Sequence, residues 1–578
     1  MFNLNAVGAR SRRSKLLRLL LWLGPILFLS LFFFYPLVSI LRTSFARTEG
    51  GVLTPFLEVL GSASMRGVFW FTIWQALLST LLTLIVGLPG AYLLARFKFR
   101  GRSLLQALTG IPFVMPTLVV AAAFNALLGP SGWLNLGLME LFGFVAPPIR
   151  ITNTLVAILL AHIFYNTTIV LRMVGDFWSH MDPRLTGASQ VLGANRWRTL
   201  WHVTVPMLMP AIITAALLVF IFDFTSFGVI LVLGGPGFAT LEVEIYYQAI
   251  SLFNLPVAAA LSVLQLTCNL ALTVAYTRLA ARLSRPMHVK PRTYTQRRLT
   301  NAPTRWMAVL IIGVMLVLLI APLMALATRS ITRLQPERGQ QQAISPGLTL
   351  DFYRQLSVNP QQSLFYVKPT TAIGISLVYA VATVVLALVL GLPASWALAR
   401  DRQSLSSRIL DPLLMLPLGT SAVTLGLGFV VALGALPIDL RASPLLVPIA
   451  HTLVAFPFVV RSLTPALRSI RPRLRQAAAT LGASPRKTMR HIDLPLVGRA
   501  VLVAATFAFS ISLGEFGATA VISRPEYPTV PVMIYRFLSQ PGAMNYGQAL
   551  ALSTILMLVC GGGMLAIERF RIADVGEF

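Results

Sequence analysis

Few side chains in the apolar stretches of this sequence carry groups that do chemistry. Asp223 and Glu515 lie within long, otherwise uncharged runs, and His162 and His451 lie in two other such runs. A buried charge is costly in a bilayer, so each carboxylate either faces a pathway, where it would attract a cationic solute, or hydrogen-bonds a helix end. Both roles remain open. For the histidines we expect hydrogen-bonded packing rather than metal ligation, because no other metal-binding side chains neighbour them.

The sequence lacks the motifs of common enzyme sites. It contains no Gly-x-x-x-x-Gly-Lys-Ser/Thr phosphate loop, no Gly-x-Ser-x-Gly nucleophile turn and no His-Glu-x-x-His zinc motif. Cys268 and Cys560 both lie in apolar runs, which favours neither a disulfide nor a thiolate metal site. We therefore expect no catalytic residue, no bound metal and no cofactor in this chain.

A pattern of small residues followed by a proline occurs twice. The first copy comprises Gly187, Ala188, Ser189, Gly193 and Pro206, and the second comprises Gln476, Ala477, Ala478, Gly482 and Pro495. Small side chains let a helix pack closely against another protein, glycine permits a backbone turn, and proline is favoured in the first turn of a helix. The residue types of both copies suit a closely packed helix, a backbone turn at the glycine and a further helix that begins near the proline.

These two copies belong to a repeat that spans the chain. Their glycines are 482 − 193 = 289 residues apart, half of the 578 residues, and the same offset pairs His162 with His451. It also pairs Phe227 with Phe516 and Tyr246 with Tyr535, but it pairs Asp223 with Ser512 and Glu515 with Ser226. Further upstream, Gly87-Leu88-Pro89 matches Gly391-Leu392-Pro393. Equivalent segments face the same side of the membrane, which indicates parallel rather than inverted repeats.

Composition places the elements that carry these residues in a bilayer. The chain is 56% hydrophobic and only 11% charged, and its net charge is +28. The basic residues lie in short runs between apolar stretches, as orientation signals do, so we expect no nucleic-acid binding. Twelve apolar stretches are long enough to span, centred near 30, 82, 116, 163, 218, 267, 316, 385, 420, 453, 510 and 558. We therefore predict an all-α polytopic membrane protein built of two parallel six-helix repeats.

Basic loops set the expected orientation and the domain boundaries. Short loops rich in Lys and Arg stay in the cytoplasm, which predicts that both termini and both small-residue loops are cytoplasmic. We expect a first half over 1–281, a basic proline-containing linker over 282–305 and a second half over 306–578. The first apolar run is long enough to span and is expected to be a retained anchor.

The small-residue loops, at about 177–206 and 466–495, resemble the "EAA" loops of binding-protein-dependent ABC importer permeases. The resemblance implies that each loop forms a short coupling helix, a turn at the glycine and a second helix that enters the membrane. It also implies a separate ABC ATPase dimer that hydrolyses ATP on the cytoplasmic side, and a separate extracytoplasmic solute-binding protein. Both copies lack the leading Glu of the family pattern, since Gly187 and Gln476 stand in its place.

Two further segments, Leu231 to Ala249 and Ser512 to Gly517, resemble the fused permeases of thiamine and ferric-iron importers. This resemblance extends over nearly the whole chain, but it indicates the family better than the solute. We expect Tyr246 and Tyr535 at the outer membrane interface. An ion-coupled secondary transporter is the alternative, because twelve spans in two parallel halves also suit that class, although paired intramembrane carboxylates at equivalent positions are lacking.

Overall fold

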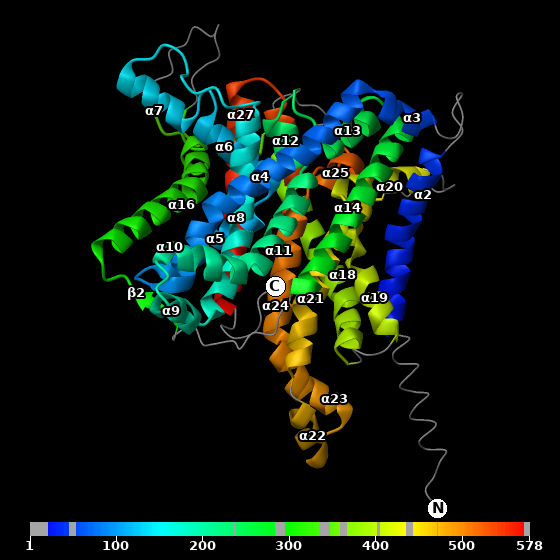
Figure 1. Cartoon of the computed structure of the whole chain (residues 1–578). Coiled ribbons are helices and arrows are strands. Elements are labelled where there is room, and N and C mark those ends of the chain that lie inside the picture. The colour runs from blue at the N-terminus through cyan, green and yellow to red at the C-terminus, as the bar shows by residue number, and fades with distance from the viewer. Residues whose placement is uncertain are drawn as a thin grey trace, which may run out of the picture.

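The computed structural model describes residues 21–45, 54–235, 237–283, 295–333, 347–358, 367–400, 405–434, 443–470 and 472–570. Residues 284–294 of the predicted linker and the basic N-terminal arm therefore lie outside the described residues. The described chain is almost entirely helical (Figure 1). Its one small sheet pairs β1 (Phe97–Lys98) in parallel with β2 (Arg297–Arg298), which joins the end of the linker to the first half.

The first half contains a π-helical segment η1 (Ser30–Phe34) that leads into α2 (Tyr35–Ser44), followed by α3 (Thr54–Gly61), α4 (Ala63–Arg96), α5 (Arg102–Val114), α6 (Thr117–Leu128), α7 (Trp133–Phe142), α8 (Leu155–His180), α9 (Pro183–Val191), α10 (Arg196–Thr199), η2 (Leu200–Thr204), α11 (Val205–Phe224), α12 (Gly228–Leu233), α13 (Leu241–Tyr246), η3 (Tyr247–Ser251) and α14 (Leu255–Leu283). The second half contains α16 (Ala302–Arg329), α17 (Asp351–Gln355), α18 (Pro369–Arg400), α19 (Leu405–Met415), η4 (Leu416–Gly419), α20 (Ala422–Gly434), α21 (Leu446–Ser469), α22 (Pro472–Thr480), α23 (Pro485–Thr488), η6 (Met489–Asp493), α24 (Leu494–Gly514), α25 (Gly517–Ile522), α26 (Val530–Leu538) and α27 (Ala543–Phe570).

Among the described residues, eleven helices are long and apolar enough to cross a membrane, and a bent pair with a 96° break makes up to twelve spans. This agrees with the predicted number. The span expected near 116 is instead found over Thr117–Phe142, and the one near 420 is the bent pair. Pro116 separates α5 from α6, and since proline lacks the N–H that a continuous helix needs, it accounts for that interruption. The bend in the second half lies after Gly419, where Thr420 has an extended backbone.

Equivalent helices pack in the same way in the two halves. Helix α4 packs on α8, and α18 packs on α21. A Cβ added to Gly87 would lie 2.8 Å from Val170, and one added to Gly391 would lie 2.6 Å from the equivalent Val459. Glycine is therefore required at both contacts, because it lets the helix axes approach closely. The repeat seen in the sequence is thus a repeat of helix packing.

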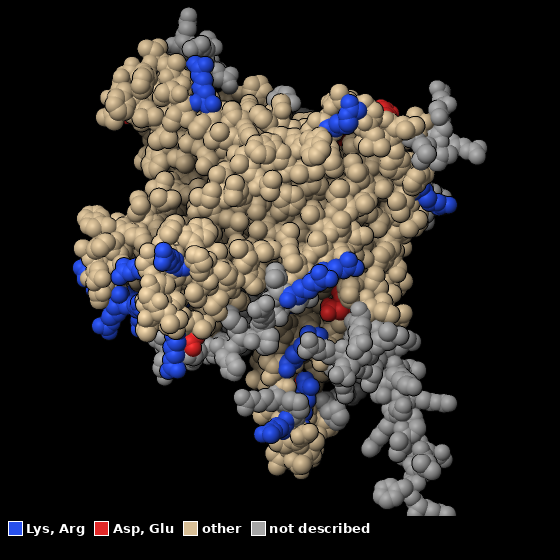
Figure 2. Space-filling view, in the orientation of Figure 1, with Lys and Arg blue, Asp and Glu red and all other residues tan. Residues whose placement is uncertain are grey.

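The two ends of the molecule differ in charge. Helices α9, α22 and α23 lie at one end, and α7, α12 and α13 lie at the other (Figure 1). Lys and Arg gather at the end that carries α9, α22 and α23, below a broad band of uncharged surface (Figure 2). This distribution is what a helical membrane protein shows when its basic loops lie on one side of the bilayer.

Candidate functional site

The first predicted docking loop is a short helix closed by a left-handed glycine. Asp182 caps α9 by accepting a hydrogen bond from the Arg184 backbone N–H at 2.9 Å. At the other end Gly193 has φ +85°, and the Ala194 N–H donates to the Ser189 carbonyl at 3.0 Å. This is the hydrogen-bond pattern of a Schellman C-cap, which places a residue with positive φ directly after the helix.

The second loop repeats this geometry. Gly482 follows α22 with φ +78°, and the Ala483 N–H donates to the Ala478 carbonyl at 2.9 Å. Ala477 and Gln476 are exposed on α22, while Ala478 is buried. In the first loop Ala188 is exposed, and Gly187 and Ser189 are half-buried. The structure thus places the three small-residue positions of each loop on one short helix, at the basic end of the molecule, with the turn glycine after it. Pro206 and Pro495 lie on α11 and α24.

Sequence reasoning missed the large apolar residues of these loops. Leu192 and Leu481 occupy equivalent positions directly before the turn glycines, and each is 87% exposed. The first loop also exposes Val191, Trp197 and Trp201, and the two tryptophan rings meet edge to face at 5.8 Å. Neighbouring exposed apolar residues mark sites of protein or membrane contact, and Trp197 and Trp201 lie within the candidate span Arg196–Phe224. Leu192 and Leu481 could have been found from the sequence, because each directly precedes the repeated glycine.

The two loops are held in place by different contacts. In the first, the Ser189 hydroxyl bonds the Thr199 hydroxyl at 2.9 Å. In the second, Arg475 Nε donates to Asp493 Oδ1 at 2.9 Å, and the same guanidinium lies 5.7 Å from the centre of the Trp396 ring. The second loop therefore has an ion pair although the leading Glu of the family pattern is replaced by Gln476.

The two prolines lie where the sequence placed them, in the first turns of α11 and α24. Each of these helices continues the helical segment that precedes it. The π-helical segments η2 and η6 directly precede the α-helical turns that contain Pro206 and Pro495. A π-helical turn shifts the hydrogen-bond pattern by one residue, which accommodates the N–H that proline lacks.

Asp223 lies in a buried polar centre at the end of α11, where its side chain is only 1% exposed. Asn166 donates a hydrogen bond to Asp223 Oδ1 at 2.6 Å, and His162 Nδ1 lies 3.4 Å from the same oxygen. His162 also bonds Ser79 through Nδ1 and Ser226 through Nε2, both at 2.9 Å. Asp223 Oδ2 has no hydrogen-bond partner among the described residues.

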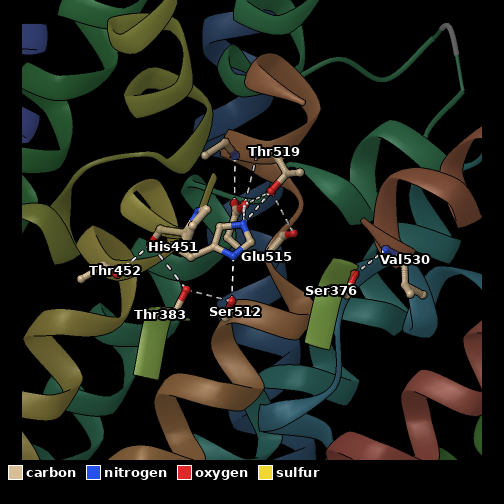
Figure 3. Close-up of polar contacts among 10 residues, drawn as sticks. Ser376, Thr383, His451, Thr452, Ser512, Glu515, Thr519 and Val530 are labelled. Carbon is tan, nitrogen blue, oxygen red and sulfur yellow. Dashed lines mark hydrogen bonds and ion pairs between the residues drawn. The ribbon is translucent and has the colours of Figure 1, made fainter. Parts of the chain in front are cut away.

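Glu515 lies in the corresponding centre of the second half (Figure 3). Its carboxylate accepts hydrogen bonds from the backbone N–H groups of Ala518 and Thr519, at 2.8 and 3.1 Å, at the start of α25. His451 Nε2 lies 3.2 Å from Glu515 Oε2, and His451 Nδ1 bonds Ser512 at 2.8 Å. Glu515 therefore has the contacts of the helix-end role that the sequence left open.

The carboxyl group and the hydroxyl group that contact the histidine occupy swapped positions in the two centres. On its Nδ1 side each histidine contacts a residue at the end of the fifth span. On its Nε2 side it contacts the residue directly before Phe227 or Phe516. In the first half these positions hold Asp223 and Ser226, and in the second half they hold Ser512 and Glu515. The described residues contain no group of three or more His, Cys, Asp or Glu side chains that could hold a metal ion. Glu515 caps the start of α25, whereas Asp223 contacts Asn166 and His162 of α8.

A known family matches both halves of the chain. The model described as "Binding-protein-dependent transport system inner membrane component" matches residues 87–285 and 391–571. The chain belongs to this family. The two matches begin at Gly87 and Gly391, and each includes one docking loop and one polar centre. The chain is thus a multi-pass inner-membrane permease of an ABC importer, with two permease halves in one polypeptide.

Curated relatives span nearly the whole permease. The thiamine transport system permease protein of Escherichia coli (strain K12) is 28% identical over 517 residues, which cover 86% of this chain and 88% of the relative. The protein of the same name from Brucella abortus (strain 2308) is 28% identical and covers 86% of both chains. A putative 2-aminoethylphosphonate transport system permease protein of Salmonella paratyphi A is 30% identical over 46% of this chain and 92% of its own.

Proposed function

We propose that this permease forms the solute pathway of a thiamine importer and is driven by a separate ATPase dimer that docks on the loops at α9 and α22. The observation that carries the coupling is the pair of loops with one geometry, each ending in an exposed leucine and a left-handed glycine. The choice of thiamine as the solute rests on the relatives named for thiamine transport, which match 86% of the chain. A separate solute-binding protein would deliver thiamine from outside.

The charge distribution supports the orientation that this function needs. An ATPase works in the cytoplasm, and basic loops favour the cytoplasmic side of a membrane. The end with α9 and α22 carries most of the visible Lys and Arg (Figure 2). With both loops on that side, the termini are cytoplasmic and α12, α13 and α25 lie toward the outside.

Copurification tests the coupling. The tagged permease, purified in mild detergent from membranes of its own host, is expected to bring an ABC ATPase with it. Leu192→Asp with Leu481→Asp should remove most of the ATPase, because a charge at each docking surface opposes burial of that surface. The control is Leu141→Asp, which places the same change on an exposed residue of α7 at the opposite end.

Retention of the ATPase by the Leu192→Asp and Leu481→Asp double variant would show that the loops are not the docking surface. Failure of any ATPase to accompany the unaltered permease, together with uptake that persists after ATP depletion, would instead favour the ion-coupled alternative. The fluorescence size-exclusion profile of each variant shows whether it is folded, so lost docking can be separated from misfolding.

A further inference from the structure

Four aromatic rings meet where the two halves of the permease contact each other. Phe227 and Phe516 stack with their ring centres 5.4 Å apart and their planes 18° apart. Tyr246 packs on Phe227 at 5.4 Å, and Tyr535 packs on Phe516 at the same distance. Tyr246 and Tyr535 were expected at the lipid interface, but the structure places them against these phenylalanines instead.

The symmetry of the repeat determines where this cluster lies. Phe227 and Phe516 are equivalent residues, because 227 + 289 = 516, and Tyr246 and Tyr535 are related in the same way. Equivalent residues of two parallel halves touch each other only at the axis that relates the halves. The cluster is thus centred on the pseudo-two-fold axis.

The cluster leaves no open space at that point. Phe227 is 6% exposed and Phe516 is 3% exposed. A Cβ added to Gly228 would lie 3.3 Å from the Phe516 ring and 2.5 Å from the Thr117 hydroxyl. The phenylalanines lie at the starts of α12 and α25, at the end of the molecule opposite α9 and α22 (Figure 1).

Each phenylalanine directly follows a residue of a polar centre. Ser226 is bonded to His162, and Glu515 lies beside His451 while it caps α25 (Figure 3). The backbone that carries each ring is therefore tied to the fourth span of its own half. A change in the angle between the halves would move the two rings as parts of rigid bodies.

We propose that Phe227 and Phe516, backed by Tyr246 and Tyr535, form the outer gate of the solute pathway, and that the two histidine centres position the gate. This inference rests on the proposed function, because it takes the axis between the halves as the solute pathway. The structure has the gate closed on the outside. Transport requires the two phenylalanine rings to separate, since an intact stack fills the axis.

Cysteine crosslinking tests whether the rings separate during the cycle. Phe227→Cys and Phe516→Cys are introduced together after Cys268 and Cys560 have been replaced by alanine, and a protease site is placed within the linker. A short bis-methanethiosulfonate reagent should then join the two halves, so that protease no longer separates them. Trapping with ATP and vanadate should lower the crosslinking rate several-fold. The single-cysteine variants are the controls.

A leak measurement tests the gate without the ATPase. Phe227→Ala with Phe516→Ala, in vesicles loaded with radiolabelled thiamine, should release the label without ATP while a larger trapped dye is retained. Phe220→Ala is the matched control, because Phe220 stacks on Phe224 within α11 rather than across the axis. Vesicles that stay tight, or a crosslinking rate that ATP and vanadate leave unchanged, would overturn the gate. Absence of a copurifying ATPase would overturn the proposed function instead, and the leak would still decide the gate.

Discussion

At the scale of single residues, Gly193 and Gly482 show how a backbone requirement shapes a docking surface. Both have positive φ, and a Cβ added to either would meet nothing within 4 Å. The cost of any other residue is therefore conformational strain rather than a clash, about 1–2 kcal/mol at each position. Gly187 is also unobstructed but lies inside α9. The two kinds of glycine should therefore respond differently to the same substitution.

Gly193→Ala and Gly482→Ala should each weaken ATPase binding several-fold, because the exposed leucine before each glycine would no longer be held in its present direction. Gly187→Ala should leave binding unchanged and stabilise α9 by about 0.5–1 kcal/mol, since alanine is the better helix former. Titration of the purified permease with the ATPase gives the three affinities. Equal effects at Gly187 and Gly193 would show that side-chain size, and not backbone conformation, matters in this loop.

Glu515 gives a second prediction at this scale. Glu515→Ala removes the acceptor for two backbone N–H groups of α25 and leaves them buried, which should cost about 1–3 kcal/mol. Glu515→Gln keeps one amide oxygen as an acceptor and should cost less. The apparent melting temperature in detergent measures both variants. An unchanged melting temperature for Glu515→Ala would mean that the cap does not stabilise the protein.

At the scale of elements, the two coupling loops have one shape but different supports. The first is closed by a hydroxyl pair, and the second by the pair between Arg475 and Asp493, whose carboxylate is buried. Removal of Arg475 leaves that carboxylate without its partner, so the second loop depends more on a single contact than the first. A partner that binds both loops therefore meets surfaces of unequal rigidity.

Arg475→Gln should speed amide hydrogen exchange in α22 several-fold, whereas Ser189→Ala should change exchange in α9 only slightly. The reason is that a neutral hydroxyl pair contributes less than a charged pair with a buried acceptor. Hydrogen exchange followed by mass spectrometry reports both helices in one experiment. If Ser189→Ala has the larger effect, the two supports have been ranked wrongly.

The elements also show what the sequence could predict. The lengths of the apolar stretches predicted the spans. The repeat offset predicted that both docking loops share one geometry, because a glycine directly after a short helix commonly adopts the left-handed conformation that ends the helix. The contacts of Asp223 and Glu515 with their histidines were not predictable, since they depend on how four helices meet. For the same reason Tyr246 and Tyr535 were misplaced at the lipid interface, where an aromatic residue beside a loop is common.

At the scale of the whole molecule, each half contributes a helix that packs against the other half, in addition to the linker that joins them. The first span of each half packs on the other half, since α2 contacts α20 and α16 contacts α6. A movement of one half therefore shifts a span that belongs to the other. Together with the aromatic stack at the axis, this arrangement would connect the proposed docking loops at one end with the proposed gate.

ATP-dependent thiamine uptake by the reconstituted importer tests the central claim most directly. Proteoliposomes containing the permease and its ATPase should accumulate radiolabelled thiamine only when ATP is inside with the ATPase and the binding protein is outside. Excess ferric citrate should not compete, and the Leu192→Asp and Leu481→Asp double variant should abolish uptake. Uptake driven by a proton gradient without ATP, or equal uptake by the double variant, would contradict the account.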